Sequence, residues 1–169
     1  MCEHGVDERG VFVQRYGSDA LDAALLLLPL MRFLPPDDPR VRATVFAIAD
    51  ELTEQGLVLR YRTEETDDGL RSGEGTFLIC SFWLVSALCE IGELDRARQL
   101  CERLLGYASP LGLYAEEIDP DTGRHLGNFP QAFTHLALIN AVMHVIRGDD
   151  QQAEQERSSW SHGDGGLGS

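Results

Sequence analysis

The sequence is poor in positive charge, and this shortage excludes two classes of function. Its 169 residues include 14 basic and 28 acidic ones, which gives a formal net charge of −14. No basic stripe is present to neutralise phosphates, so nucleic acid is excluded as a partner. An anionic membrane surface is excluded on the same ground. The charge leaves binding of a neutral ligand open.

Long hydrophobic runs are also absent. The longest apolar stretch, residues 23–31, is too short to span a bilayer and contains Pro29. The first residues, Met1 to His4, have neither the basic flank nor the apolar stretch of a secretory signal. We therefore expect a soluble chain in a reducing, cytoplasmic compartment.

Cysteines are few, and none of them forms a CxxC pair. Cys80, Cys89 and Cys101 fall inside expected helices, whereas Cys2 lies close to His4 at the start of the chain. Isolated cysteines within helices are typical of small, reduced core residues rather than of disulfides or metal ligands. Since the sequence contains no metal-binding motif, we expect neither a metal site nor a cofactor.

Three segments of the chain begin alike, each with a glycine, mostly apolar residues and then a large polar pair. They start at Gly10, Gly56 and Gly112, and each precedes a polar loop and a strongly apolar helix. The expected helices begin near residues 19, 74 and 129, which is a fixed spacing. Such a period indicates stacked repeats of one supersecondary unit.

The repeats make Gln14, Arg60 and Glu116 equivalent, because each lies four residues after its glycine. If the repeats wrap around an axis, these side chains converge, and we expect the functional site there. Glu116 shares its loop with further acidic residues. Of these, Asp119 and Asp121 belong to an ordinary turn, so we interpret them as structural.

Helical periodicity predicts an all-α fold with five helices. We expect them at residues 19–33, 39–55, 74–91, 94–107 and 129–147. The first and third are apolar on most sides and therefore buried, whereas the second and fourth are amphipathic. This alternation favours part of an (α/α) toroid with the long loops at one end. An open helical solenoid of interaction repeats is the alternative.

Prolines and glycines set the expected helix ends. Pro29 should kink the first helix or break it near its end. Asp38 should cap the second helix, with Pro39 at its first position. Gly56 and Gly148 are expected to end the second and fifth helices. Residues 149–169, rich in Gln, Glu, Ser and Gly, predict a disordered polar tail, which leaves residues 1–148 as the ordered part.

The loop around Glu116 carries a resemblance to a known family. Residues 115–119 read Ala-Glu-Glu-Ile-Asp, and residues 126–135 read Leu-Gly-Asn-Phe-Pro-Gln-Ala-Phe-Thr-His. Together with shorter stretches, including Arg60-Tyr61 and Phe82-Trp83, they make residues 8–147 resemble glycoside hydrolase family 15, the glucoamylase and bacterial trehalase type. The resemblance implies the C-terminal portion of an (α/α)6 catalytic domain for residues 1–148.

The same resemblance implies hydrolysis of α-linked glucosides with inversion. That reaction needs a general acid and a general base, with carboxyl groups ~6.5–9.5 Å apart. Glu116 aligns with the general base, and Arg60 aligns with an arginine that binds the sugar. Glu74, Glu117 and Gln131 are candidate substrate-binding residues. The substrate would be trehalose, maltose or a maltodextrin, and the chemistry requires no cofactor.

The chain departs from the family pattern in two respects. The resemblance implies a general acid well upstream of the matching region, and no residue here corresponds to it. It also implies twelve helices, of which five are expected. We therefore expect this chain alone to be inactive and to self-associate through exposed apolar helix faces. The alternative function is a truncated helical fragment that acts only as a binding or assembly module, and a scaffold unrelated to sugars is a further one.

Overall fold

The computed structural model describes residues 2, 4–62 and 76–163 and shows a mainly helical chain with short strands. In chain order the elements are η1 (Ala23–Leu26, a 3-10 helix), α1 (Leu27–Leu30), α2 (Pro39–Glu51), β1 (Thr53–Glu54), β2 (Leu57–Val58), β3 (Thr76–Phe77), α3 (Leu78–Glu90), α4 (Leu94–Leu105), β4 (Glu117–Ile118), β5 (His125–Leu126) and α5 (Ala132–Gly163). The expectation of a helical fold with five helices is confirmed, whereas the strands were not expected.

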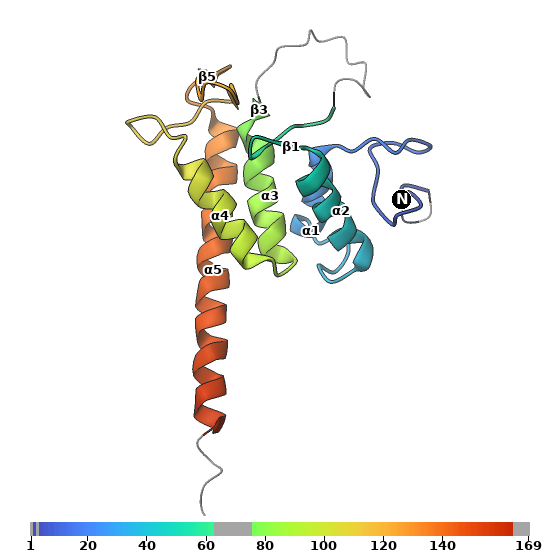
Figure 1. Cartoon of the computed structure of the whole chain (residues 1–169), viewed down its shortest axis with the longest axis vertical. Helices are drawn as coiled ribbons and strands as arrows, with labels where there is room; N and C mark the ends of the chain where they lie inside the picture. Colours follow the sequence, from blue (N-terminus) through green and yellow to red (C-terminus); the bar gives the residue numbers. More distant parts are fainter. Residues whose placement is uncertain (1, 3, 63–75, 164–169) are drawn as a thin grey trace, which may run out of the picture.

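Helix α3 is the centre of the molecule, and every other helix packs against it. Helices α1, α3 and α5 form one layer, with α2 and α4 on one side of it (Figure 1). Most side chains of α3 are buried, as its nearly continuous apolar sequence predicts. Helix α4 instead buries only Ala97, Cys101 and Leu104 and turns its charged side chains outward.

Buried hydroxyl groups fix the incoming loops to the helices. The backbone N–H of Val58 in β2 donates to Oγ of Ser81 on α3 at 2.9 Å. In the same way, the N–H of Phe12 donates to Oγ1 of Thr44 on α2 at 2.9 Å. Because a buried N–H without a partner is costly, these bonds determine where each loop lies on its helix.

The first helix is shorter than the predicted range of 19–33. Helical turns are confined to η1 and α1, residues 23–30. Asp22 caps them, since its Oδ1 accepts a hydrogen bond from the N–H of Ala24 at 2.7 Å. Pro29 has no N–H for a bond to the carbonyl of Leu25, and the helix ends one residue later. The predicted break at Pro29 is therefore confirmed.

Helix α2 begins as predicted but ends earlier. Asp38 accepts the N–H of Arg40 at 2.9 Å, and Pro39 is the first helical residue. The predicted end at Gly56 is wrong, because α2 stops at Glu51 and the strands β1 and β2 follow. Gln55 and Gly56 form the turn between them with φ of 50° and 83°. Two positive φ values in a two-residue loop match the twist of a hairpin.

The predicted end of the fifth helix at Gly148 is also wrong. Helix α5 continues to Gly163, so residues 149–163 are helical rather than disordered, whereas 164–169 lie outside the described residues. A Cβ on Gly148 would lie 2.6 Å from Cδ1 of Leu94, so the glycine allows α5 to approach α4 closely. Asp149 then accepts a hydrogen bond from Arg98 on α4 at 2.5 Å. The polar end of α5 projects beyond the other helices (Figure 1).

The cysteines in the helices are core residues, as predicted. Cys80 and Cys101 are buried, Cys89 is half-buried and Cys2 is exposed, and all of them are free thiols. Burial raises the pKa of both Cys80 and Cys89 to about 12 and also raises the pKa of Cys101. The thiols within the helices are therefore protonated at neutral pH and unreactive.

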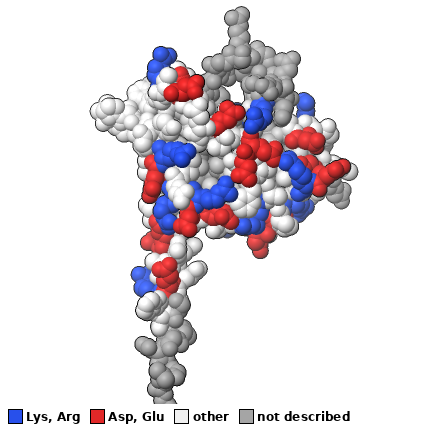
Figure 2. All heavy atoms as spheres, in the orientation of Figure 1, with Lys and Arg blue, Asp and Glu red and all other residues white. Residues whose placement is uncertain are grey.

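Charge is mixed on the surface. Figure 2 shows acidic and basic side chains interspersed over the face that carries α2 and α4. Arg42 pairs with Glu93 at 3.0 Å and Arg96 with Asp50 at 3.4 Å, both across these two helices and their connections. No helix in the described ranges is both long enough and apolar enough to cross a membrane.

Candidate active site

The loop that carries Glu116 belongs to a small three-stranded sheet at the N-terminal end of α3. Strand β4 lies between β3 and β5, with Glu117 opposite both Phe77 and Leu126. Asp119 makes the turn after β4, because its Oδ1 accepts the N–H groups of Asp121 and Thr122. A hydrogen bond from the side chain of Thr122, together with these backbone bonds, lowers the pKa of Asp119. The turn confirms the structural role predicted for this aspartate.

Glu116 is fixed by backbone hydrogen bonds on both sides. Its carbonyl accepts the N–H of Leu78, the first residue of α3, at 3.1 Å. Its N–H donates to the carbonyl of Asn128 at 2.9 Å. Glu116 therefore lies between the start of α3 and the loop that leads into α5, with its side chain partly buried.

The carboxylate of Glu116 is held by the loop opposite. Its Oε2 accepts the side-chain Nδ2–H of Asn128 at 2.8 Å and the backbone N–H of the same residue at 3.2 Å. Within the described part of the chain, Oε1 accepts no hydrogen bond, and no group of three or more metal-ligating side chains is found. Oε2 is therefore fixed by two donors of the same residue.

Arg60 belongs to a second polar cluster, built around Asp22. The guanidinium Nε of Arg60 lies 3.9 Å from Oδ2 of Asp22, and its side chain is 54% exposed. The Nε2–H of Gln14 donates to the same carboxylate oxygen at 3.4 Å. The carbonyl of Arg60 accepts the N–H of Ala23 at 2.8 Å. Two of the three equivalent repeat positions, Gln14 and Arg60, therefore meet on one carboxylate.

A groove lies beside the Asp22 cluster. It measures about 370 Å³, and besides Gln14 and Asp22 its lining is apolar, from residues of η1, α1 and the turn that follows: Ala24, Leu25, Leu27, Leu28, Met31 and Phe33. The apolar face of this first helix is therefore open to solvent in the described structure.

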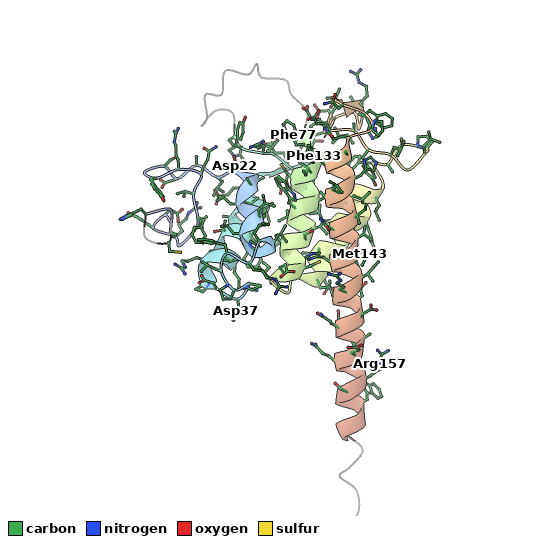
Figure 3. All side chains as sticks on the ribbon, turned by 180° about the vertical axis from the view of Figure 1, so that it is seen from behind. Asp22, Asp37, Phe77, Phe133, Met143 and Arg157 are labelled. Atoms are coloured by element: carbon green, nitrogen blue, oxygen red, sulfur yellow. The ribbon has the colours of Figure 1, made fainter. Side chains whose placement is uncertain are left out.

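Both clusters lie at the same end of the helical layer. Arg60 follows β2, which is bound to Ser81 in the first turns of α3, and Glu116 is bound to Leu78 at the start of α3. Asp22, Phe77 and Phe133, labelled in Figure 3, mark this end, Asp22 directly before η1, Phe77 on β3 and Phe133 on α5. Among the described residues, no hydrogen bond or ion pair joins Glu116 to Arg60 directly.

The other candidates differ in their placement. Gln131 lies directly before α5, and its N–H donates to the carbonyl of Tyr114 at 3.0 Å, two residues from Glu116. Its carbonyl accepts a hydrogen bond from Nδ1 of His135 at 2.7 Å, while Nε2 of His135 accepts the N–H of Tyr114. Glu117 lies within β4. Glu74 lies outside the described residues.

Two residues that the structure brings to the candidate site were assigned no role in the sequence analysis. Asn128 donates two hydrogen bonds to the carboxylate of Glu116. The carboxylate of Asp22 accepts a hydrogen bond from Gln14 and pairs with Arg60. Asp22 directly precedes η1 and is 8% exposed, and its burial beside an arginine arises from the fold, so the sequence carried no signal for it. Asn128 could have been found from the register of the β4–β5 hairpin.

The chain matches the model of a known family over most of its length. This family is described as glycosyl hydrolases family 15, and it matches residues 1–101 and 92–143. The two matched ranges include both polar clusters.

Curated relatives cover nearly the whole chain. A trehalase of Mycobacterium tuberculosis is 78% identical over 151 residues, and one of Mycolicibacterium smegmatis is 78% identical over 147 residues. A trehalase of Thermoplasma volcanium is 46% identical over 144 residues. The matches cover 89%, 87% and 84% of this chain. The chain itself spans 22% to 23% of the length of these relatives.

Solved structures with a similar fold are glycosidases. A wild-type glycosidase aligns with a TM-score of 0.67 and 22% identity, over 84% of this chain and 40% of that chain. A variant described as being in complex with glucose aligns equally well, with a TM-score of 0.67. At this identity the likeness concerns the fold alone.

Proposed function

Because the chain belongs to glycosyl hydrolase family 15, we propose that it forms part of the catalytic domain of an α-glucoside hydrolase whose substrate is trehalose. The trehalase relatives at 78% identity support this substrate over maltose and maltodextrins. The observation that carries the proposal is the carboxylate of Glu116, fixed through one oxygen at the end of the helical layer where Arg60 also lies.

Glu116 acts as the general base in this proposal. Its Oε1 takes a proton from a water molecule while the water oxygen attacks the anomeric carbon from the face opposite the leaving group. The bond from the anomeric carbon to the bridging oxygen breaks, and a general acid protonates that oxygen. The attack inverts the configuration, so trehalose yields one α-glucose and one β-glucose. The general acid comes from a segment outside these 169 residues.

Arg60 binds hydroxyl groups of the sugar in this scheme. Its planar guanidinium presents several N–H donors in a fixed geometry. The carboxylate of Asp22 lies against Nε, which leaves the outer nitrogens for a ligand. Gln131, Glu117 and Glu74 are the further candidate substrate-binding residues. Glu117 belongs to β4, the N–H of Gln131 bonds to the carbonyl of Tyr114 two residues before Glu116, and Glu74 precedes β3 in the sequence.

The helical layer is, in this proposal, an arc of an (α/α)6 toroid. Helices α1, α3 and α5 are inner helices and α2 and α4 are outer ones. The similarity to 40% of a glycosidase chain supports an arc rather than a closed ring. Closure then requires helices from outside this chain, at the open faces of α1 and α5.

A chimeric enzyme tests this proposal. The matched 147-residue segment of the M. smegmatis trehalase is exchanged for that of this chain, and release of glucose from trehalose is measured. We expect an active chimera, and we expect Glu116→Gln to lower kcat about 10²–10⁴-fold, the range of general base catalysis. Glu102→Gln, an exposed carboxylate on α4, is the matched control and should retain activity.

The alternative function predicts a different result. A helical fragment that serves only as a binding or assembly module has no need of Glu116. An active chimera in which Glu116→Gln keeps full activity would refute the role of this residue. The 169-residue chain by itself should release no glucose, because the general acid is not part of it.

A further inference from the structure

Among the described residues, the loop that follows β5 makes the most hydrogen bonds to Glu116. Three hydrogen bonds join Glu116 to Asn128: the backbone N–H of Glu116 to the carbonyl of Asn128, and two donors of Asn128 to Oε2 of Glu116. The two residues are twelve positions apart and are brought together by the β4–β5 hairpin. Both donors of Asn128 bind the same carboxylate oxygen, Oε2.

We propose that Asn128 is a positioning residue for Glu116, and this inference rests on the proposed role of Glu116 as the general base. Asn128 holds Oε2 and thereby sets the direction of Oε1, the oxygen that takes the proton from water. A bond from a neutral donor to a carboxylate is stronger than one between neutral groups. Two such bonds on a single oxygen restrict rotation of the carboxylate.

Gly127 makes this contact sterically possible. A Cβ at position 127 would lie 3.0 Å from Oε2 and 3.1 Å from Cβ of Glu116. Both distances are shorter than ordinary carbon contacts, and φ of Gly127 is 69°, which disfavours other residues. The pair Gly127-Asn128 therefore fits closely around the carboxylate, glycine by its small size and asparagine by its donors.

Asn128 has little part in the packing of the chain. Its side chain is exposed, and the hydrogen bonds in which the structure engages it go to Glu116. Loss of the Asn128 side-chain amide should therefore change the orientation of the Glu116 carboxylate more than the stability of the folded chain. A positioning role predicts a lower kcat with an unchanged melting temperature, whereas a structural role predicts a lower melting temperature.

The test uses the chimera with trehalose and separates kcat from KM. Asn128→Asp keeps the size of the side chain but replaces the donor with a second negative charge beside Glu116. Asn128→Ala removes only the side-chain donor. We expect kcat to fall about 10–100-fold in Asn128→Ala and further in Asn128→Asp, with KM nearly unchanged, since small errors in position cost that much in rate.

The controls identify the cause of any loss. Asp121→Ala is the control, because it also removes an exposed hydrogen bond from a side-chain amide to a carboxylate. In that bond Nε2 of Gln55 donates to Oδ1 of Asp121 at 2.8 Å. This variant should leave kcat unchanged. Melting temperatures of both Asn128 variants should stay close to that of the parent. Gly127→Ala should also lower kcat, because it displaces the same carboxylate from the other side.

The outcomes distinguish this inference from the proposed function. If Glu116→Gln is inactive while Asn128→Asp retains the parent kcat, Glu116 is the base and the positioning role of Asn128 is refuted. If Asn128→Asp is more active than Asn128→Ala, size rather than donation matters, and the inference fails as well. If Glu116→Gln is active, the base is another residue, and both proposals fall together.

Discussion

Asp38 shows how a single side chain fixes the start of a helix. Its carboxylate accepts the N–H of Arg40 at 2.9 Å and pairs with the guanidinium of Arg40 at 2.8 Å. These bonds, chiefly the one from the Arg40 side chain, lower the pKa of Asp38 from 3.8 to about 2. The ionised carboxylate is therefore favoured in the folded chain.

The depressed pKa predicts how the stability contributed by Asp38 depends on pH. A lowered pKa in the folded state means that the contribution is complete above pH 3.8 and is lost as the pH falls through about 2. We expect Asp38→Ala to lower the melting temperature at pH 7 and to lower it less at pH 3. Thermal unfolding followed by circular dichroism measures this difference.

The neighbouring aspartate supplies the control for that measurement. Asp37 is exposed, and Asp37→Ala should leave the melting temperature unchanged at both pH values. An equal effect of Asp38→Ala at pH 7 and pH 3 would contradict the assignment of the effect to the ionised cap.

Sequence reasoning at the residue scale succeeded where the interaction is local. Asp38 and Pro39 are adjacent to the helix they start, so their roles were predicted correctly. Asn128 reaches Glu116 only through a hairpin, and its role depends on the register. The turn at Asp119 was recognised, but the sequence did not predict the strands on either side of it, so the partner of Glu116 stayed unidentified.

Among the elements, β2 depends on α3 through one buried hydroxyl. Ser81→Ala should lower the free energy of unfolding by about 1–3 kcal/mol, because it leaves the buried N–H of Val58 without an acceptor. Urea denaturation measures the change. Ser86→Ala is the matched control on the same helix, since Oγ of Ser86 only donates to the carbonyl of Phe82 one turn earlier. Equal losses in the two variants would exclude this explanation.

Helix positions were predicted well from the apolar periodicity, but the C-terminal ends of α2 and α5 were not. The glycines Gly56 and Gly148 were interpreted as helix ends because glycine favours that position. In the structure Gly56 forms a hairpin turn, and Gly148 lies inside α5 where Leu94 leaves no room for a Cβ. Both roles depend on a neighbour distant in sequence, so the local pattern could not distinguish them.

On the scale of the whole molecule, the helical layer has two uncovered apolar sides. One is the groove beside η1 and α1. The other is a stripe on α5, where large apolar side chains recur every three or four residues and are 42% to 66% exposed: Phe133, Leu136, Ile139, Met143 and Ile146. An apolar stripe of this kind marks an interaction surface.

The stripe on α5 predicts that the isolated chain self-associates. We expect sedimentation velocity to show oligomers whose fraction rises with concentration. The double variant Leu136→Glu with Ile139→Glu should shift the distribution towards monomer, because burying two charges opposes association. Gln151→Glu with Gln155→Glu adds the same charge to the polar part of α5 and should not. A parent chain that stays monomeric throughout would contradict the prediction.

The sequence predicted the alternation of buried and outer helices but not whether they belong to a closed toroid. Apolar and amphipathic helices alternate because buried and outer helices need different surfaces, and this is visible in the residues themselves. In the proposed toroid, helices from outside this chain would cover the open faces of α1 and α5. Closure of a toroid therefore stays a prediction.

The central place of α3 has a consequence for hydrogen exchange. Every other helix contacts α3, whereas α1 and α5 lie at the two edges of the layer. Edge helices can open while the remainder stays packed, and such partial openings require less free energy than complete unfolding. Backbone amides of α3 should then exchange with deuterium only when the whole chain unfolds, and those in the projecting half of α5 should exchange first. Protection of backbone amides against exchange should therefore be highest in α3 and lower in α1 and α5, the helices at the edges of the layer.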